Sequence, residues 1–248
     1  MFSFRDTRRS VDFPLQRGPP PCVRRPGVRF SAMTTALKPR RKPSQSRAWM
    51  TSIAIQDAFV LLLLEKGYEK TSMRDIANVA GVSVGSVYQY FPGKEAVAAV
   101  TVRTWVRKLS TALSSAVDEV VQAEGQRTLR EITRLLAQTQ VHTMLEGGGR
   151  WRVLSSIERR VSPQLVYNRL YQHNVNLFGK ALTCAVDWPE GLHDARVAFG
   201  AYTVVDALVK QTLLVSAVLP SADIMVQEVL LALDGYLQAV RQSHARQE

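Results

Sequence analysis

Residues 67–94 read GYEKTSMRDIANVAGVSVGSVYQYFPGK, and this stretch decides the fold of the region around it. Ser72 is a favourable N-cap, and Asp75 three residues later completes the pattern of a capping box, so a helix is predicted after Ser72. Gly81 stands where a left-handed C-terminal cap is wanted, and Ser83 can cap a second helix. These signals predict two short helices joined by a tight corner, which is a helix-turn-helix.

The apolar residues of this stretch indicate which side of each helix is buried. In the second helix, Val87 and Phe91 are expected to face the core, which turns Gly85 and Gln89 to the opposite side. Gly85 would let the backbone approach a DNA groove closely, and Gln89 can form a bidentate pair with an adenine edge in the major groove. The first helix has its apolar residues at the i, i+3, i+4, i+7 spacing of one buried face: Met73, Ile76, Ala77 and Ala80.

The neighbours of this face indicate two further kinds of contact with DNA. Val84 and Tyr88 could touch a thymine methyl group, although Tyr88 could instead pack against the first helix of the domain. Hydroxyls and free N–H groups at helix N-termini, together with positive charge nearby, favour phosphate. The candidate DNA-binding residues are therefore Thr71, Ser72, Arg74, Ser83, Val84, Gly85, Ser86, Tyr88, Gln89 and Lys94.

The order G-Y-x-x-T-S-M-x-x-I-A-x-x-A-G-V-S-x-G-S-V-Y-x-Y-F-x-x-K in residues 67–94 resembles the DNA-binding domain of the TetR family of transcriptional repressors. The resemblance covers about residues 47–97, with conservative departures at Phe59 and Val97. It implies a three-helix helix-turn-helix domain, followed by a variable helical domain that dimerises and holds an effector. The expected first helix has one apolar face at i, i+3, i+4, i+7 and i+8, formed by Ile55, Ala58, Phe59, Leu62 and Leu63.

A rival motif overlaps the same residues, because positions 81–85 also match G-x-S-x-G, the nucleophile elbow of hydrolases. That elbow requires a buried strand before the serine and a triad that continues with an acid and a histidine. Here a capped helix precedes Ser83, and no alternation of strands and helices could build a hydrolase sheet. We therefore expect no enzyme activity, although four histidines follow: His142, His173, His193 and His244.

The positive charge of the chain is concentrated near its start. The formal net charge is +11, and residues 1–48 contain twelve Lys or Arg against two Asp. A Pro19-Pro20-Pro21 run and the lack of an apolar signal core predict a disordered basic tail over residues 1–46. This tail could track phosphates or enter the minor groove, or it could be inert. A third reading is that translation starts at Met33.

Apolar runs and cysteines exclude two other classes of protein. Runs such as residues 59–64 and 213–219 are much shorter than the ~20 residues that cross a bilayer, so no membrane partner is expected. Cys22 and Cys184 make neither a disulfide framework nor a metal site. The chain therefore reads as cytoplasmic, without metal or cofactor.

From Lys94 onward the pattern stays helical, which predicts an all-α protein. We expect a long helix over 94–124, a helix over 128–145, a flexible corner at 147–149 and a shorter helix after it. Ser162 and Pro163 should be the N-cap and first residue of a helix that runs towards Cys184. A loop over 187–191 should precede helices over 193–219 and 222–241, the latter capped by Ser221. The predicted domains are a tail (1–46), a helix-turn-helix domain (47–93) and an effector-binding and dimerisation domain (94–243).

The last two predicted helices carry more apolar surface than a small domain needs inside. In proteins that this chain resembles, these helices pair with their copies in a four-helix interface. The resemblance therefore implies a homodimer whose two recognition helices meet a palindromic DNA operator about one helical turn, or somewhat more, apart. The apolar residues concerned are Phe199, Tyr202, Val205, Val209, Leu213, Val226, Leu230, Leu233 and Leu237.

The resemblance also implies an effector pocket between the long helix and the dimer helices. Between positions 150 and 186 the sequence has six basic residues against Glu158 alone, although most of them could lie on solvated surface. A cationic ligand would want buried carboxylates, so a small apolar effector that is neutral or anionic is expected. The candidate ligand-binding residues, which are aromatic or apolar and could equally be core, are Trp105, Met144, Trp151, Tyr167, Tyr171 and Phe178.

These features favour a sequence-specific repressor of the TetR type that a small effector releases from its operator by shifting the conformational population. Two other functions remain open from the sequence. One is an activator, or an effector-independent regulator, of the same fold. The other is a non-specific architectural DNA-binding protein driven by the basic tail, with a steep dependence on salt.

Overall fold

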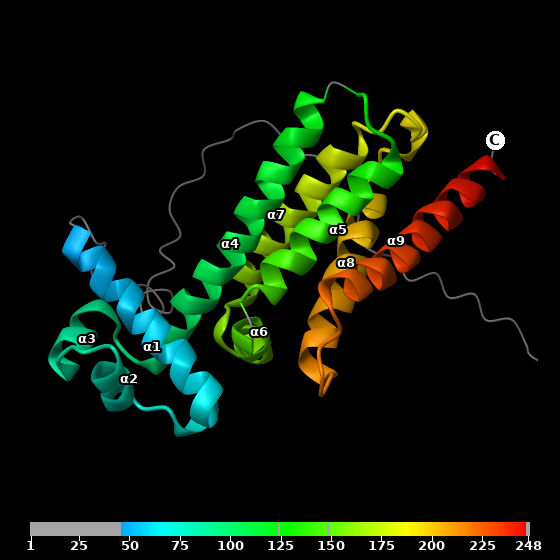
Figure 1. Cartoon of the computed structure of the whole chain (residues 1–248). Helices are drawn as coiled ribbons and strands as arrows, with labels where there is room; N and C mark the ends of the chain where they lie inside the picture. The colour runs from blue at the N-terminus through cyan, green and yellow to red at the C-terminus, as the bar shows by residue number, and fades with distance from the viewer. Residues whose placement is uncertain (1–45, 124, 148, 247–248) are drawn as a thin grey trace, which may run out of the picture. The chain divides into compact units, whose positions relative to one another are not determined.

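The computed structural model describes residues 46–123, 125–147 and 149–246. Every regular element within these ranges is a helix (Figure 1), which confirms the all-α prediction. The predicted tail lies outside the described residues, apart from its last residue, which begins α1. The helices are α1 (Ser46–Lys70), α2 (Met73–Val79), α3 (Val84–Tyr90), α4 (Lys94–Gln122), α5 (Leu129–Leu145), α6 (Gly149–Val161), α7 (Gln164–Leu182), the short 3-10 helix η1 (Glu190–Leu192), α8 (Ala195–Val215) and α9 (Ala222–Ala245).

Most helix starts follow from local capping, and three predicted boundaries were wrong, among them the end of α9, which lies at Ala245 and not at residue 241. Ser221 caps α9 by accepting from the backbone N–H of Ile224, as predicted. For α7, however, Pro163 is itself the N-cap, because its ψ of 137° is extended and its carbonyl accepts the first helical hydrogen bonds. Helix α8 ends at Val215, four residues earlier than predicted, because Ser216 turns extended with a ψ of 126°.

The described chain contains two hydrophobic cores, and two helices contribute to both. The first core, which we call the N-terminal core, joins α1, α2 and α3 with the start of α4 and with three residues of α6, namely Leu154, Ile157 and Val161. The second, the bundle core, joins the rest of α4 with α5, α7, α8 and α9, and it includes Trp151 of α6. The predicted border at residue 93 remains a prediction, since α4 and α6 lie after it but contribute residues to the N-terminal core.

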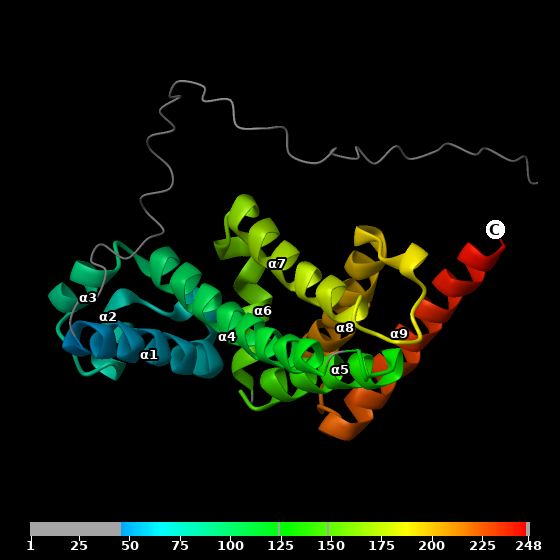
Figure 2. The same cartoon turned by 90° about the horizontal axis from the view of Figure 1, so that it is seen from above.

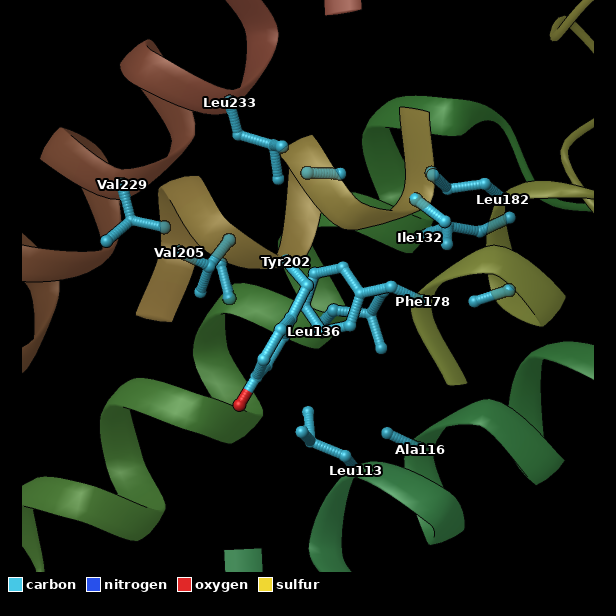
Figure 3. Close-up of a cluster of buried hydrophobic side chains, with 14 of the residues drawn as sticks. Leu113, Ala116, Ile132, Leu136, Phe178, Leu182, Tyr202, Val205, Val229 and Leu233 are labelled. Carbon is cyan, nitrogen blue, oxygen red and sulfur yellow. The ribbon is translucent and has the colours of Figure 1, made fainter. Parts of the chain in front are cut away.

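The long helix α4 runs from the helix-turn-helix to the bundle, where it packs against α5 and α7 (Figure 1). Helices α7 and α8 pack against each other, and α9 packs against α5 and α8, as the view from above also shows (Figure 2). Tyr202 of α8 lies in the bundle core, where its ring contacts that of Phe178 (Figure 3). This arrangement leaves the helix-turn-helix corner at one end of α4.

Two of the described helices pass a test for membrane spans that uses length and composition alone, residues 47–70 and 195–215. In each, 44% of the most apolar window is buried inside the protein. These buried sides belong to the N-terminal core and the bundle core, respectively. The prediction judged runs of consecutive apolar residues and did not anticipate this result.

Candidate nucleic-acid interface and effector site

The corner between α2 and α3 is held by hydrogen bonds between residues close in sequence. Ser72 and Asp75 form the predicted capping box, in which each side chain accepts from the backbone N–H of the other residue. Gly81 has a φ of 66°, the left-handed conformation that favours glycine, and ends α2. The N–H of Gly81 bonds to the carbonyl of Asn78, and the N–H of Val82 bonds to that of Ala77. This pair of bonds is a Schellman motif, and it satisfies carbonyls that the end of a helix leaves free.

Lys66 of α1 also fixes the start of α2. Its ammonium lies 2.8 Å from the carboxylate of Asp75. This ion pair, with the hydrogen bonds from Ser72, holds the pKa of Asp75 well below its ordinary value. The carboxylate thus stays ionised at the N-terminus of α2, where the helix dipole also favours negative charge.

Helix α3 presents the predicted face to solvent. Ser83 caps it by accepting from the N–H of Ser86, while Val87 and Phe91 are fully buried. Gly85 and Gln89 are exposed on the opposite side, as expected from the helical period. Tyr88 is 43% exposed, which leaves part of its ring accessible to a DNA groove. Val84 and Ser86 are half-buried beside this face.

Two of the candidate phosphate-binding residues are already engaged within the protein. The hydroxyl of Thr71 is buried and donates to the carbonyl of Gly67 at 2.8 Å. The ammonium of Lys94 donates to the carbonyl of Tyr68 at 2.9 Å and lies 4.4 Å from the centre of its ring. Both bonds secure the end of α1, where Gly67 has a φ of 77°. Ser72 and Arg74, by contrast, are exposed.

A second set of contacts links the end of α1 to α6. The guanidinium of Arg160, near the end of α6, lies 4.8 Å from the ring centre of Tyr68 and forms an ion pair with Glu69. Lys94 and Arg160 therefore both contact Tyr68, one from α4 and one from α6. The sequence gave no signal for these contacts, because Tyr68, Lys94 and Arg160 are far apart along the chain.

The six candidate ligand-binding residues fall into two groups in the structure. Trp105 and Trp151 meet edge to face with ring centres 5.5 Å apart, and Trp151 donates its ring N–H to the carbonyl of Thr143. Met144 is fully buried and, like Trp151, belongs to the bundle core. These residues fill the protein interior, as the alternative reading of aromatic residues allowed.

The second group lies along α7, and part of it borders an open groove. The rings of Tyr167 and Tyr171 are stacked with centres 5.9 Å apart, whereas Phe178 is buried against Tyr202. Burial raises the pKa of both Tyr167 and Tyr171, so both stay neutral. The groove between α7 and α8 has a volume of about 560 Å³ and is lined by Tyr167, Asn168, Tyr171, Gln172, Phe199, Asp206, Ala207, Lys210 and Gln211.

Charged residues that the sequence analysis did not select line this groove and the helices behind it. The ammonium of Lys210 lies 3.0 Å from a carboxylate oxygen of Glu158 and 3.2 Å from one of Asp206. These two partners raise the pKa of Lys210 although burial opposes the shift, so the ammonium is charged. A signal was present in the sequence, because Asp206 and Lys210 are the only charged residues in the interior of the apolar α8 and are four residues apart.

Buried polar side chains extend from Asp206 across the bundle. Asp206 accepts from the amide of Gln140 at 3.2 Å and from the hydroxyl of Tyr202 at 3.3 Å. Tyr202 in turn accepts from Asn174 at 2.9 Å, and Asn174 accepts from Ser110 at 2.7 Å. We call this set, together with Glu158 and Lys210, the polar network. It joins residues of α4, α5, α6, α7 and α8.

The basic residues that suggested an anionic effector do not gather in a pocket. Arg150, Arg160, Arg169 and Lys180 are exposed. Arg160 forms an ion pair with Glu69 and Lys180 forms one with Asp118, and both ion pairs lie at the surface. Arg152 donates to the carbonyl of Ser216, outside the groove lining. Two buried carboxylates, those of Glu158 and Asp206, nevertheless lie in this part of the bundle. The expected class of effector, neutral or anionic, stays a prediction.

The residues chosen for the dimer interface were also largely misassigned. Seven of the nine are buried in the protomer's own core, and Leu230 is half-buried, because the apolar stripes of α8 and α9 face each other and the bundle. Phe199 alone is exposed, and it borders the groove. A different set of apolar residues on and after these helices is exposed: Leu208, Val215, Val218, Ile224 and Leu231.

The serine of the G-x-S-x-G match has a structural role. The hydroxyl of Ser83 caps α3 and lies 2.8 Å from that of Ser86, and a helix rather than a strand precedes it. Across the described ranges there is no strand and no group of three His, Cys, Asp or Glu that could hold a metal ion. The nucleophile elbow thus lacks the sheet on which it would stand.

Comparison with known proteins matches this geometry. Residues 55–100 match the family model described as bacterial regulatory proteins, tetR family. A TetR-family transcriptional regulator from Mesorhizobium loti is 18% identical with a TM-score of 0.60, over 79% of this chain and 98% of its own. SmeT, the repressor of the Stenotrophomonas maltophilia multidrug efflux pump SmeDEF, is 21% identical with a TM-score of 0.57, over 77% of this chain and 91% of its own. FadR from Bacillus subtilis, solved in complex with stearoyl-CoA, is 20% identical with a TM-score of 0.51, over 75% of this chain and 95% of its own.

A search of curated protein sequences found no match. The similar structures share the fold at low identity, and the family match spans most of α1, the α2–α3 corner and the start of α4. Those are the elements that carry the exposed face of α3 and the caps that position it. Residues 55–100 therefore carry the domain of the tetR family of bacterial regulatory proteins, and the described chain has the fold of TetR-family transcriptional regulators.

Proposed function

We propose that this regulator is a homodimeric repressor that a small effector releases from a palindromic operator. The observation that carries the proposal is the exposed face of α3, held by a capped and locally rigid corner at the end of α4. In this proposal Gln89 reads a base edge in the major groove, and Gly85 allows the close approach. Tyr88 and Val84 add apolar contacts, with Ser86 beside them.

Phosphate contacts would fix the position of α3 without reading sequence. Ser72, Arg74 and Ser83 are exposed at or near helix N-termini, which supports this role. Thr71 and Lys94 were also proposed, but their polar atoms are bound within the protein. We propose that these two act mainly by holding the end of α1 in place beside the corner.

A dimer is required if the operator is a palindrome, since two-fold symmetry in the DNA mirrors that of the protein. The exposed apolar residues of α8 and α9, with Val218 between the helices, support an interface through these helices. Leu231 is 70% exposed in the protomer, and its burial against a second copy would remove a large apolar side chain from water.

The response to an effector would pass through α6. This helix contributes Leu154, Ile157 and Val161 to the N-terminal core, while Glu158 on the same helix bonds to Lys210 beside the groove. A ligand that alters the positions of groove residues therefore acts on a helix that also packs against α1 and α4. To release DNA, the ligand must bind the conformer with misplaced recognition helices more tightly than the other.

The similar structures do not decide the class of effector. One of them was solved with stearoyl-CoA, and another is the repressor of a multidrug efflux pump. The expectation of a neutral or anionic effector rested on an excess of basic residues, and these lie at the surface. The groove itself is a better guide, because aromatic rings and the carboxylate of Asp206 line it.

Selection of bound DNA from a random pool tests the proposal directly. A repressor of this kind should enrich a palindrome with half-sites about one helical turn, or somewhat more, apart. A reporter gene placed behind that palindrome should be less active when the protein is present. Enrichment of no preferred sequence would instead support the architectural alternative, and increased reporter activity would support an activator.

A further inference from the structure

The groove between α7 and α8 combines aromatic walls with buried negative charge. Tyr167, Tyr171 and Phe199 line it, and Asp206 and Lys210 lie along the α8 side. Phe199 is 50% exposed although it contacts Tyr171, with ring centres 5.9 Å apart. A cavity with apolar rings and a few convergent polar groups is the usual form of a small-molecule site.

The charges beside the groove do not cancel. Glu158 and Asp206 contribute two carboxylates, and the ammonium of Lys210 contacts both. The cluster of three therefore carries a net charge of −1, with both carboxylates buried. An uncompensated buried charge is costly, so a second cation close to Asp206 would be favourable.

The same region is short of hydrogen-bond donors. The amide nitrogen of Gln140 donates to Asp206, but the amide oxygen of Gln140 is buried and has no partner among the described residues. Gln140 is fully buried, so bulk water does not satisfy this oxygen. Gln140 itself does not line the groove, so it is the net charge beside Asp206 that favours a ligand with positive charge.

The aromatic wall already contacts one cation. The guanidinium of Arg159 lies 4.2 Å from the ring centre of Tyr167, and Tyr167 stacks on Tyr171. Arg159 is exposed and also donates to Gln164, so it can leave the ring at little cost. The ring face is thus suited to a positive group from a ligand, because a cation is attracted to the face of an aromatic ring.

We propose that the α7–α8 groove binds a small organic cation with an apolar or aromatic body, with Asp206 as its counter-charge and Tyr167 and Tyr171 as its walls. This inference rests on the proposed function in taking the helical domain to hold an effector. The cation would neutralise the cluster formed by Glu158, Asp206 and Lys210. It would also displace the side chain of Arg159 from Tyr167.

A pair of probes of equal size and opposite charge tests this proposal. The tetraphenylphosphonium cation and the tetraphenylborate anion have almost the same apolar body, so a difference in affinity reports charge. Binding is measured by calorimetry on the full chain without DNA, at about 0.3 M salt, where long-range attraction to the basic tail is screened. We expect saturable binding of the cation, at least about tenfold tighter than that of the anion. Equal affinity, preference for the anion, or no binding of the cation would overturn the proposal.

Two substitutions should change the affinity for the cation in opposite directions. Asp206→Asn removes the counter-charge and should weaken tetraphenylphosphonium binding by about tenfold or more. Arg159→Gln removes the competing cation from the ring of Tyr167 and should strengthen binding severalfold. Arg150→Gln, the same change at an exposed position near the start of α6, is the matched control and should have no effect. If Asp206→Asn does not fold, Arg159→Gln still decides, since unchanged or weaker binding by that variant contradicts the proposal.

The failure of this inference can be distinguished from the failure of the proposed function. Binding of the probe is read without DNA, whereas the selected palindrome and the reporter test repression. A protein that selects a palindrome but does not bind the cation retains the proposed function and refutes this site. A protein that binds the cation but selects no sequence has the site and lacks the proposed function.

Discussion

The α2–α3 corner and the α7–α8 groove are held together in opposite ways. Bonds in the corner join residues a few positions apart, such as Ser72 with Asp75, and Ser83 with Ser86. The polar network beside the groove joins residues that are up to 66 positions apart, as in the bonds from Gln140 to Asp206 and from Ser110 to Asn174. The corner owes most of its shape to its own sequence, whereas the shape of the groove depends on five helices at once.

This difference suggests what each region can do. A corner fixed by local caps presents the same surface whatever happens in the bundle, which suits the reading of a fixed DNA sequence. A set of buried polar groups shared by many helices responds as a unit, because each group left without a partner is costly. The groove therefore suits a site at which ligand binding must alter the positions of other helices.

The largest effect is expected at the dimer face, outside both regions. Leu231→Asp places a charge in the proposed interface, which should cost about 3 kcal/mol or more and weaken operator binding about 100-fold. The protomer should stay folded, because Leu231 is mostly exposed. Sedimentation should show monomers, and circular dichroism should show unchanged helix.

Two controls define that result. Val121→Asp adds the same charge at another exposed apolar position, on α4, and should leave the dimer intact. Leu213→Asp should instead abolish folding, since Leu213 is fully buried in the bundle core. A Leu231→Asp variant that remains dimeric would place the interface elsewhere.

A smaller effect should follow from Gln89→Ala, which tests the corner as a surface for reading bases. The loss of one bidentate contact should cost ~1–3 kcal/mol on the cognate operator and relax the preference at one position in each half-site. The measurement is binding to cognate and singly substituted operators, with Gln122→Ala at the far end of α4 as the control. Full retention of the wild-type base preference would show that Gln89 does not face the bases.

Arg74→Ala and Lys94→Ala should act on different properties. Arg74→Ala should weaken binding to all sequences alike and make the salt dependence shallower by roughly one unit per subunit, because one phosphate contact is lost. Lys94→Ala should instead lower the free energy of unfolding by about 1–2 kcal/mol, since it removes the bond to Tyr68 and the contact with its ring. Salt titrations and urea unfolding separate the two. A shallower salt slope in Lys94→Ala would support its original assignment to phosphate.

The smallest effect is expected from removal of residues 1–35. The dimer and the operator preference should remain, because the caps and cores of the described chain lie beyond this segment. Affinity for unrelated DNA at low salt should fall slightly, as fewer counterions are released. Loss of sequence preference in the shortened protein would assign the tail a direct role in recognition.

The corner was predictable from sequence because its determinants are local. A serine before a helix and a glycine after it act through the backbone of their own neighbours, so Ser72, Gly81 and Ser83 could be assigned without tertiary information. The same local reasoning failed where tertiary packing decides. The periodicity that identifies Leu213 as apolar does not indicate whether it faces the protomer core or a second copy.

The groove was only partly predictable for the same reason. Tyr167 and Tyr171 border the groove, whereas Met144, Trp151 and Phe178 lie in the core, and ligand binding by any of the six candidates stays a prediction. The charge beside the groove could not be inferred from residues 150–186 alone, because Asp206 and Lys210 lie outside that stretch. Two opposite charges four residues apart within an apolar helix are a usable signal, since burial would otherwise be too costly.

The packing of α6 against the N-terminal core limits how this chain can evolve by recombination. Because Leu154, Ile157 and Val161 complete the N-terminal core from a position more than fifty residues downstream, residues 47–93 do not form a closed unit. An exchange of the DNA-reading part between two relatives would need to carry a compatible α6, or the recipient would expose an apolar surface on α1. Recombination at the border before α4 should therefore be rarer than substitution on the exposed side of α3, where new operator preferences can arise one residue at a time.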